Sequence, residues 1–100
     1  MPSQRRKLVT IITESAIEEK VCRTIAKLGA TGYTVTDARG SGSRGARNAR
    51  WSSSGNVRIE VVCDDVVAAR IASYLQDNFY ADYAMVLFET DVSVLRPEKF

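Results

Sequence analysis

The spacing of apolar residues changes once, from alternate positions to helical spacing, within the segment Asn56-Val-Arg-Ile-Glu-Val-Val-Cys-Asp-Asp-Val-Val-Ala-Ala-Arg-Ile-Ala-Ser-Tyr-Leu75. Its first eight residues begin with strict alternation of apolar and polar side chains, which predicts a strand. Asp64 and Asp65 follow. An aspartate before a helix caps its first amides, and its negative charge interacts favourably with the positive N-terminal end of the helix. Apolar residues then recur at helical spacing, at Val67, Ile71, Leu75 and Phe79. The segment therefore predicts a strand that leads directly into a helix.

The same order stands upstream of this segment. Residues 8–13 form a β-branched run that predicts a strand, and Ser15 with Glu18 fits a capping box at a helix start. Helical spacing follows at Ile17, Val21, Ile25 and Leu28. Gly29 is then the expected C-cap, because glycine adopts the left-handed conformation that ends a helix. Glu14 lies at the end of this strand, where a role at the helix start and a role in a binding cleft are both open.

Two further strands complete the predicted fold. One covers residues 32–36, and another covers 84–95 with a break expected near Asp91. The order βαββαβ predicts a single α+β domain over residues 1–100 with the ferredoxin-like split βαβ arrangement. Both helices would cover one face of the sheet and leave the other bare. An apolar bare face predicts an oligomer in so small a protein.

The composition is that of an ordinary globular protein and excludes several kinds of site. The net charge is only +2, and no apolar run approaches the ~18 residues of a membrane span. The absence of histidine removes the commonest general base and metal ligand. Cys22 and Cys63 lack metal-type spacing, which predicts reduced thiols in a cytosolic protein and no metal site.

Residues 39–50 are the strongest functional signal in the chain. They hold four arginines, three glycines and no acidic residue. Arginine binds phosphate through a planar charged fork, and glycine lets the backbone approach an anion closely. The loop at about 39–55 therefore predicts an anion-binding arm, although a solvated linker has the same composition. A nucleic-acid-binding module that uses this basic loop is the alternative function, and it predicts salt-dependent binding.

With the fold and the arm placed, the chain resembles the PII-like signalling proteins. The similarity is strongest to the SbtB-type regulators that are paired with the cyanobacterial sodium-dependent bicarbonate transporter. It extends over nearly the whole chain and is most specific where residues 32–35 lead into the Gly/Arg loop. The matching residues are Leu8-Val9, Ile12-Thr13-Glu14, Gly32-Tyr33-Thr34-Val35, Gly40, Gly42, Ser43, Arg44, Arg47, Asp82-Tyr83-Ala84 and Val94-Leu95 to Phe100.

The resemblance implies a homotrimer with an adenine nucleotide in each cleft between subunits. Arg44 and Arg47 would hold the phosphates, and the loop after Gly40 would be the family's mobile T-loop. The full set implied for the nucleotide is Tyr33, Thr34, Gly40, Gly42, Ser43, Arg44, Arg47, Ala84 and Met85. Ala84 and Met85 would belong to the wall that a neighbouring subunit supplies. The loop that meets a partner would carry Arg39, Arg50 and Trp51.

The resemblance also implies what the protein does. It would sense cyclic AMP, AMP, ADP or ATP, the last two with or without a divalent cation, and would hold no covalent cofactor. Through its T-loop it would regulate a bicarbonate transporter in the carbon concentrating mechanism. It would be cytoplasmic and reach the membrane through that partner. A regulator rather than an enzyme is expected, because no nucleophile–base pair is visible. The chain departs from the family at Met85, where relatives often have glycine, and at Ser41, where they often have lysine.

Overall fold

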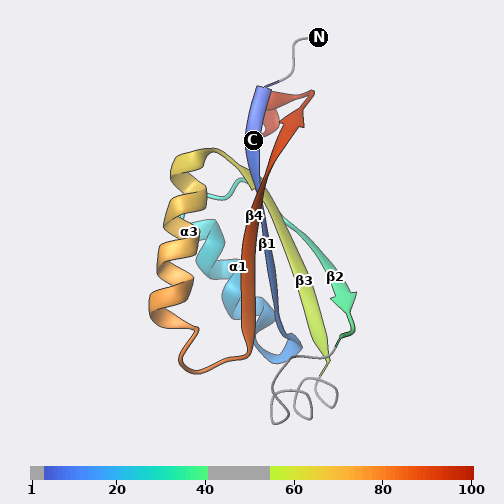
Figure 1. Cartoon of the computed structure of the whole chain (residues 1–100), viewed down its shortest axis with the longest axis vertical. Coiled ribbons are helices and arrows are strands. Elements are labelled where there is room, and N and C mark those ends of the chain that lie inside the picture. Colours follow the sequence, from blue (N-terminus) through green and yellow to red (C-terminus); the bar gives the residue numbers. More distant parts are fainter. Residues whose placement is uncertain (1–3, 41–54) are drawn as a thin grey trace.

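The computed structural model of the chain describes residues 4–40 and 55–100. Four strands form one antiparallel sheet in the order β2-β3-β1-β4, with α1 and α3 on the same face (Figure 1). The elements are β1 (Gln4–Glu14), a 3-10 turn (Ser15–Ile17), α1 (Glu18–Lys27), β2 (Thr34–Ala38), β3 (Asn56–Cys63), α3 (Asp65–Asn78), β4 (Met85–Val94) and a second 3-10 turn (Pro97–Lys99). This arrangement confirms the predicted βαββαβ fold.

The core lies between the helices and the face of the sheet that they cover. Alternate residues of β1 and β3 point into it, and both helices contribute their predicted apolar stripes. Its fully buried members are Val9, Ile11, Val21, Ile25, Val57, Ile59, Val61, Ile71 and Leu75. Asp64 caps α3 as predicted, because its side chain accepts a hydrogen bond of 2.9 Å from the amide of Val67. Gly29 ends α1 with a φ of +118°, the conformation predicted for a C-cap.

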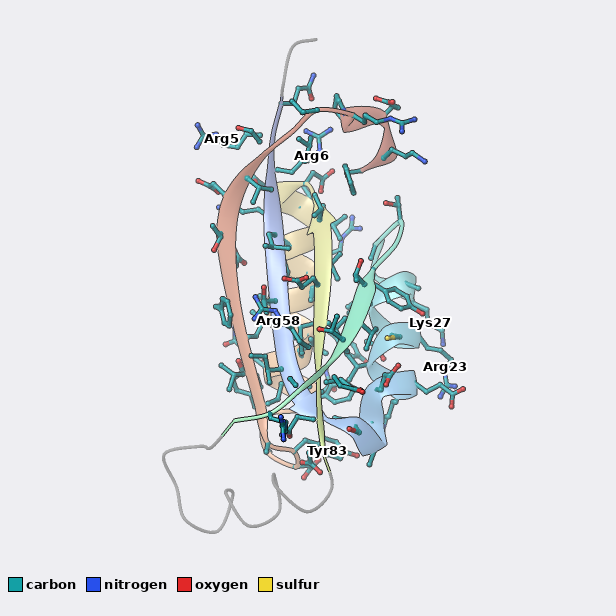
Figure 2. The ribbon with its side chains drawn as sticks, turned by 90° about the vertical axis from the view of Figure 1, so that its right-hand side faces the viewer. Arg5, Arg6, Arg23, Lys27, Arg58 and Tyr83 are labelled. Carbon is teal, nitrogen blue, oxygen red and sulfur yellow. The ribbon has the colours of Figure 1, made fainter. Side chains whose placement is uncertain are left out.

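The opposite face of the sheet, here called the outer face, is covered by neither α1 nor α3 (Figure 1). Figure 2 looks onto this face, with Arg58 in front of the strands and α3 behind them. Cross-strand register places Thr10 between Glu60 and Phe88, and Ile12 between Arg58 and Val86. Phe88 is 44% exposed and Val86 43% exposed. An apolar stripe therefore runs along the outer face at β4, as the sequence predicted.

Three local predictions need correction. The capping box predicted for Ser15 and Glu18 does not form, and α1 starts without a side-chain cap. The chain first makes a 3-10 turn there, and the Ser15 amide donates instead to the carbonyl of Gly55. The break expected near Asp91 is absent, because Asp91 pairs with Lys7 and β4 continues to Val94. β2 begins two residues later than predicted, where pairing with β3 begins at Thr34.

Candidate functional site

One wall of the predicted site lies along β2, an edge strand of the sheet. Tyr33 directly precedes β2, and Thr34 is its first residue, opposite Glu60 of β3. Arg39 and Gly40 follow the end of the strand and are exposed. A Cβ atom added at Gly40 would meet no heavy atom within 4 Å. The backbone of this wall is therefore open to a ligand.

The side chain of Tyr33 turns away from the outer face toward α1. The thiol of Cys22 lies beside it, and the electrostatic effect of this neighbour raises the pKa of the Tyr33 phenol. A shallow groove of about 500 Å³ beside it is lined by Glu18, Glu19, Cys22, Arg23, Ala26 and Tyr33. Arg23 and Lys27 point from α1 into solvent (Figure 2). Residue 33 therefore offers its backbone, rather than its ring, to the outer side of β2.

The other predicted wall lies at the start of β4, the opposite edge strand. Ala84 and Met85 are both buried, and the Met85 side chain belongs to the core on the helix side. Both backbone groups of Ala84 bond to the end of β1. The Thr13 hydroxyl donates to the Ala84 carbonyl at 3.0 Å, and the Glu14 carboxylate accepts from the Ala84 amide at 2.8 Å. The start of β4 is therefore held in a fixed orientation.

The two walls cannot meet within one chain. β2 and β4 are the two edges of a four-stranded sheet, so three interstrand spacings separate them, which is about 14 Å. The strands β3 and β1 fill the space between them. Within one chain the two walls therefore lie on opposite edges of the sheet and do not form one pocket side by side.

The remaining predicted residues lie outside the described residues. They are Gly42, Ser43, Arg44, Arg47, Arg50 and Trp51. Residues 4–40 and 55–100 hold no group of three side chains suited to a metal ion. Neither helix in this part of the chain has the length and apolarity to cross a membrane.

Glu14 is the residue of this region whose role the sequence left open. It is only 8% exposed, and it bonds Ala84 across 70 positions of sequence. Its Cα partner on β3 is Asn56, which follows the long loop. The sequence signals such a role only by placing an acidic residue at the end of an apolar strand. Acidic residues are rarely buried at such a position unless they have a partner. Glu14 thus lies between the end of the loop and the start of β4.

The comparisons with known proteins agree with this geometry. Residues 6–99 match the family model described as nitrogen regulatory protein P-II. A PII-like signalling protein from Thermus thermophilus is 41% identical, with 100% of this chain and 99% of that one covered and a TM-score of 0.86.

Two further solved structures are less similar in sequence. CPII from Thiomonas intermedia K12, bound to ADP and bicarbonate, is 25% identical over 99% of this chain and 97% of that one, with a TM-score of 0.85. The GlnK–ATP complex of B. subtilis is 20% identical over 90% of this chain and 85% of that one, with a TM-score of 0.58, and shows a related fold. The match to the family model, together with the 41% identity over the whole chain, shows that the chain belongs to the PII family as a PII-like signalling protein.

Proposed function

We propose that this PII-like protein senses adenine nucleotides, which bind in clefts between the subunits of a homotrimer. The observation that carries the proposal is the placement of the two predicted walls on opposite edges of one sheet. An open backbone at Gly40 and a fixed backbone at Ala84 become parts of one pocket only when two copies meet. ADP bound to CPII and ATP bound to GlnK support this class of ligand.

The outer face supports assembly of identical chains. Phe88 and Val86 are nearly half exposed in the single chain, and β4 carries them at the edge of the sheet. Apolar stripes of this kind mark protein–protein contacts, and closed symmetry is the usual form of a homo-oligomer. Three copies would cover the outer faces around one axis and form three equivalent clefts.

The proposed output is regulation of a bicarbonate transporter by the T-loop at about 39–55. In this proposal Arg44 and Arg47 hold the phosphates, and Arg39, Arg50 and Trp51 belong to the surface that meets the partner. Different nucleotides offer different charge to the same arginines, so they would favour different arrangements of the loop. The protein would be a cytoplasmic regulator without catalytic turnover, bound to the membrane only through its transporter.

Isothermal titration of the purified protein tests the ligand. Cyclic AMP, AMP, ADP and ATP are titrated with and without Mg²⁺, and ADP is also titrated with and without bicarbonate. We expect micromolar binding of at least one nucleotide at one per chain. A short RNA serves as the control, and salt-sensitive RNA binding without nucleotide binding would favour the nucleic-acid alternative.

Two variants test the phosphate assignment. Arg44→Ala and Arg47→Ala should each weaken nucleotide binding by about 2 kcal/mol, because each removes a charge-assisted hydrogen bond. Arg23→Ala is the matched control, since Arg23 lies exposed on α1 and pairs with Glu19 of the same helix. Unchanged affinity in both loop variants would contradict the assignment of these arginines.

The partner is tested separately from the ligand. Membrane vesicles that contain a sodium-dependent bicarbonate transporter are mixed with the protein, and the bound fraction is measured with each nucleotide. We expect that fraction to depend on which nucleotide is present and to fall when Arg50 and Trp51 are both replaced by Ala. Equal binding to vesicles without the transporter would contradict the proposed partner.

A further inference from the structure

The end of β1 holds two segments that are far apart in the sequence. On one side the Glu14 carboxylate accepts from the Ala84 amide at 2.8 Å, and the Thr13 hydroxyl donates to the Ala84 carbonyl at 3.0 Å. All three residues are buried, and Thr13 is fully so. A hydrogen bond to a buried carboxylate is stronger than one between neutral groups and is costly to break. These two bonds therefore tie the backbone of Ala84 to the end of β1.

On the other side the end of β1 holds the point where the chain returns to the sheet. The amide of Ser15 donates to the carbonyl of Gly55 at 3.1 Å. Gly55 has a φ of +77°, and a Cβ atom added there would lie 3.2 Å from the Ser15 hydroxyl oxygen. Only glycine fits this conformation and this close contact without strain. The return point is therefore fixed against β1.

At the other end of the same long loop, no hydrogen bond among the described residues ties Gly40 to β1. Gly40 has no heavy atom within 4 Å of an added Cβ atom and does not adopt a positive φ. At Gly55 the loop therefore returns to the sheet at a residue that is hydrogen-bonded to the end of β1. From Gly55 the contacts lead to Ser15, then to the adjoining Glu14, and then to Ala84. These contacts form one continuous connection between the loop and the β4 edge (lower end of the chain in Figure 1).

We propose that Glu14 is a positioning residue that couples the start of β4 to the loop through the Ser15–Gly55 contact. Its carboxylate fixes Ala84, and its neighbour Ser15 fixes Gly55, so a shift at either end changes the free energy of the other. The functional consequence rests on the proposed nucleotide site, because Ala84 and Met85 form one wall of it. A ligand that moves this wall would then act on the loop of the same chain.

Amide hydrogen exchange of the nucleotide-free full chain, read by NMR, tests the coupling. Gly55→Ala strains the return point, and it should raise the exchange rate of the Ser15 and Ala84 amides by about fivefold or more. Gly40→Ala is the matched control, since it places the same methyl group in open space at the other end of the loop. We expect the Gly40→Ala rates at both amides to stay within about twofold of the wild type.

The result at Ala84 decides the proposal. An Ala84 amide that keeps its wild-type rate in Gly55→Ala would overturn the coupling, whether or not the Ser15 rate rises. A second pair of variants tests Glu14 itself. Glu14→Ala should raise the rate at Ala84 by about tenfold, because it removes the acceptor, whereas Glu14→Gln keeps an oxygen acceptor and should stay within about threefold. Equal rates in these two variants would also overturn it.

ADP titration of the same proteins separates this inference from the proposed function. Glu14→Ala should bind ADP about tenfold more weakly than the wild type, and Glu14→Gln should stay within about threefold. Val66→Ala, on the exposed side of α3, should match the wild type. A wild type that binds no ADP would contradict the nucleotide site but leave the exchange result standing. Wild-type affinity in Glu14→Ala would contradict the positioning role alone.

Discussion

Cys63 lies at the end of β3, where burial raises the pKa of its thiol to about 11. The unfolded thiol ionises near pH 9, so the unfolded state loses this proton first as the pH rises. The stability that the neutral thiol contributes is therefore complete below pH 9 and lost as the pH rises through about 11. We expect the unfolding free energy of the wild type to fall more steeply over this range than that of Cys63→Ala.

Urea unfolding at pH 8, 9 and 10 measures this difference. Tyrosines and lysines titrate in both proteins, so only the difference in slope between them reports on Cys63. Parallel slopes would contradict the assigned pKa. The folded protein should also react slowly with a thiol reagent at neutral pH, since both cysteines are buried and burial raises the pKa of Cys22 as well.

Lys7 and Asp91 form a cross-strand pair between β1 and β4, with 2.7 Å between the lysine Nζ and the aspartate Oδ1. The hydrogen bond from Lys7 lowers the pKa of Asp91 below its ordinary value of 3.8. The pair therefore stabilises the folded state above that ordinary pKa and loses its effect as the pH falls through the lowered value. Asp91→Asn should lower the Tm more at pH 7 than at pH 2, as thermal unfolding followed by circular dichroism can show. A deficit that persists undiminished at pH 2 would contradict this account.

Residues with a purely local signal were the easier ones to predict. The Asp64 cap and the Gly29 terminus depend on neighbours within a few positions, and both are confirmed. Glu14 is different, because its partner Ala84 is 70 positions away. Nothing in the surrounding sequence distinguishes a helix-start carboxylate from one that holds another strand. Its role became visible only when the sheet brought the two segments together.

At the scale of elements, α3 supplies the most sensitive test of the core. Ile71 is fully buried between α3 and the sheet, whereas Val66 on the same helix is 59% exposed. Ile71→Ala should reduce the unfolding free energy by about 2–4 kcal/mol through lost burial and a cavity. Val66→Ala should change it by less than about 0.5 kcal/mol. Urea denaturation of both variants makes the comparison, and equal losses would contradict the assigned core.

The elements also show where sequence patterns fail. The strand and helix over residues 56–78 were predicted well, because alternation, cap and helical spacing agree there. The capping box predicted at the start of α1 was wrong, because the Gly55 carbonyl accepts the hydrogen bond from the Ser15 amide. The break in β4 was wrong because Lys7 stabilises Asp91 inside the ladder. Both errors come from contacts between distant segments, which a local pattern cannot contain.

For the whole molecule, the decisive feature is the apolar stripe on the outer face. Phe88→Glu puts a charge into that stripe and should leave the protein a monomer of 11.1 kDa in place of the proposed oligomer, because burying an unpaired carboxylate is costly. Tyr74→Glu is a matched control, since Tyr74 is 43% exposed on α3 and Phe88 is 44% exposed on β4. Light scattering gives both masses. A Phe88→Glu protein with the same mass as Tyr74→Glu would contradict assembly through this face.

The sequence predicted the family and the two walls of the site, but it could not show how far apart the walls lie. That distance follows from strand order, since β3 and β1 separate the two edges. Residues 32–35 come directly before the loop in the sequence, whereas residues 84–85 follow it only after β3 and α3. The resemblance implied that residues 84–85 belong to the wall of a neighbouring subunit, and the sheet topology places the two segments on opposite edges.

The central claim is that the nucleotide site exists only between chains, and ADP titration of the same two variants tests it most directly. The wild type and Tyr74→Glu should bind one ADP per chain with micromolar affinity. Phe88→Glu, shown by circular dichroism to be folded and by light scattering to be monomeric, should bind ADP at least about tenfold more weakly, because each site has lost one wall. A folded monomer that binds ADP as tightly as the wild type would contradict the claim.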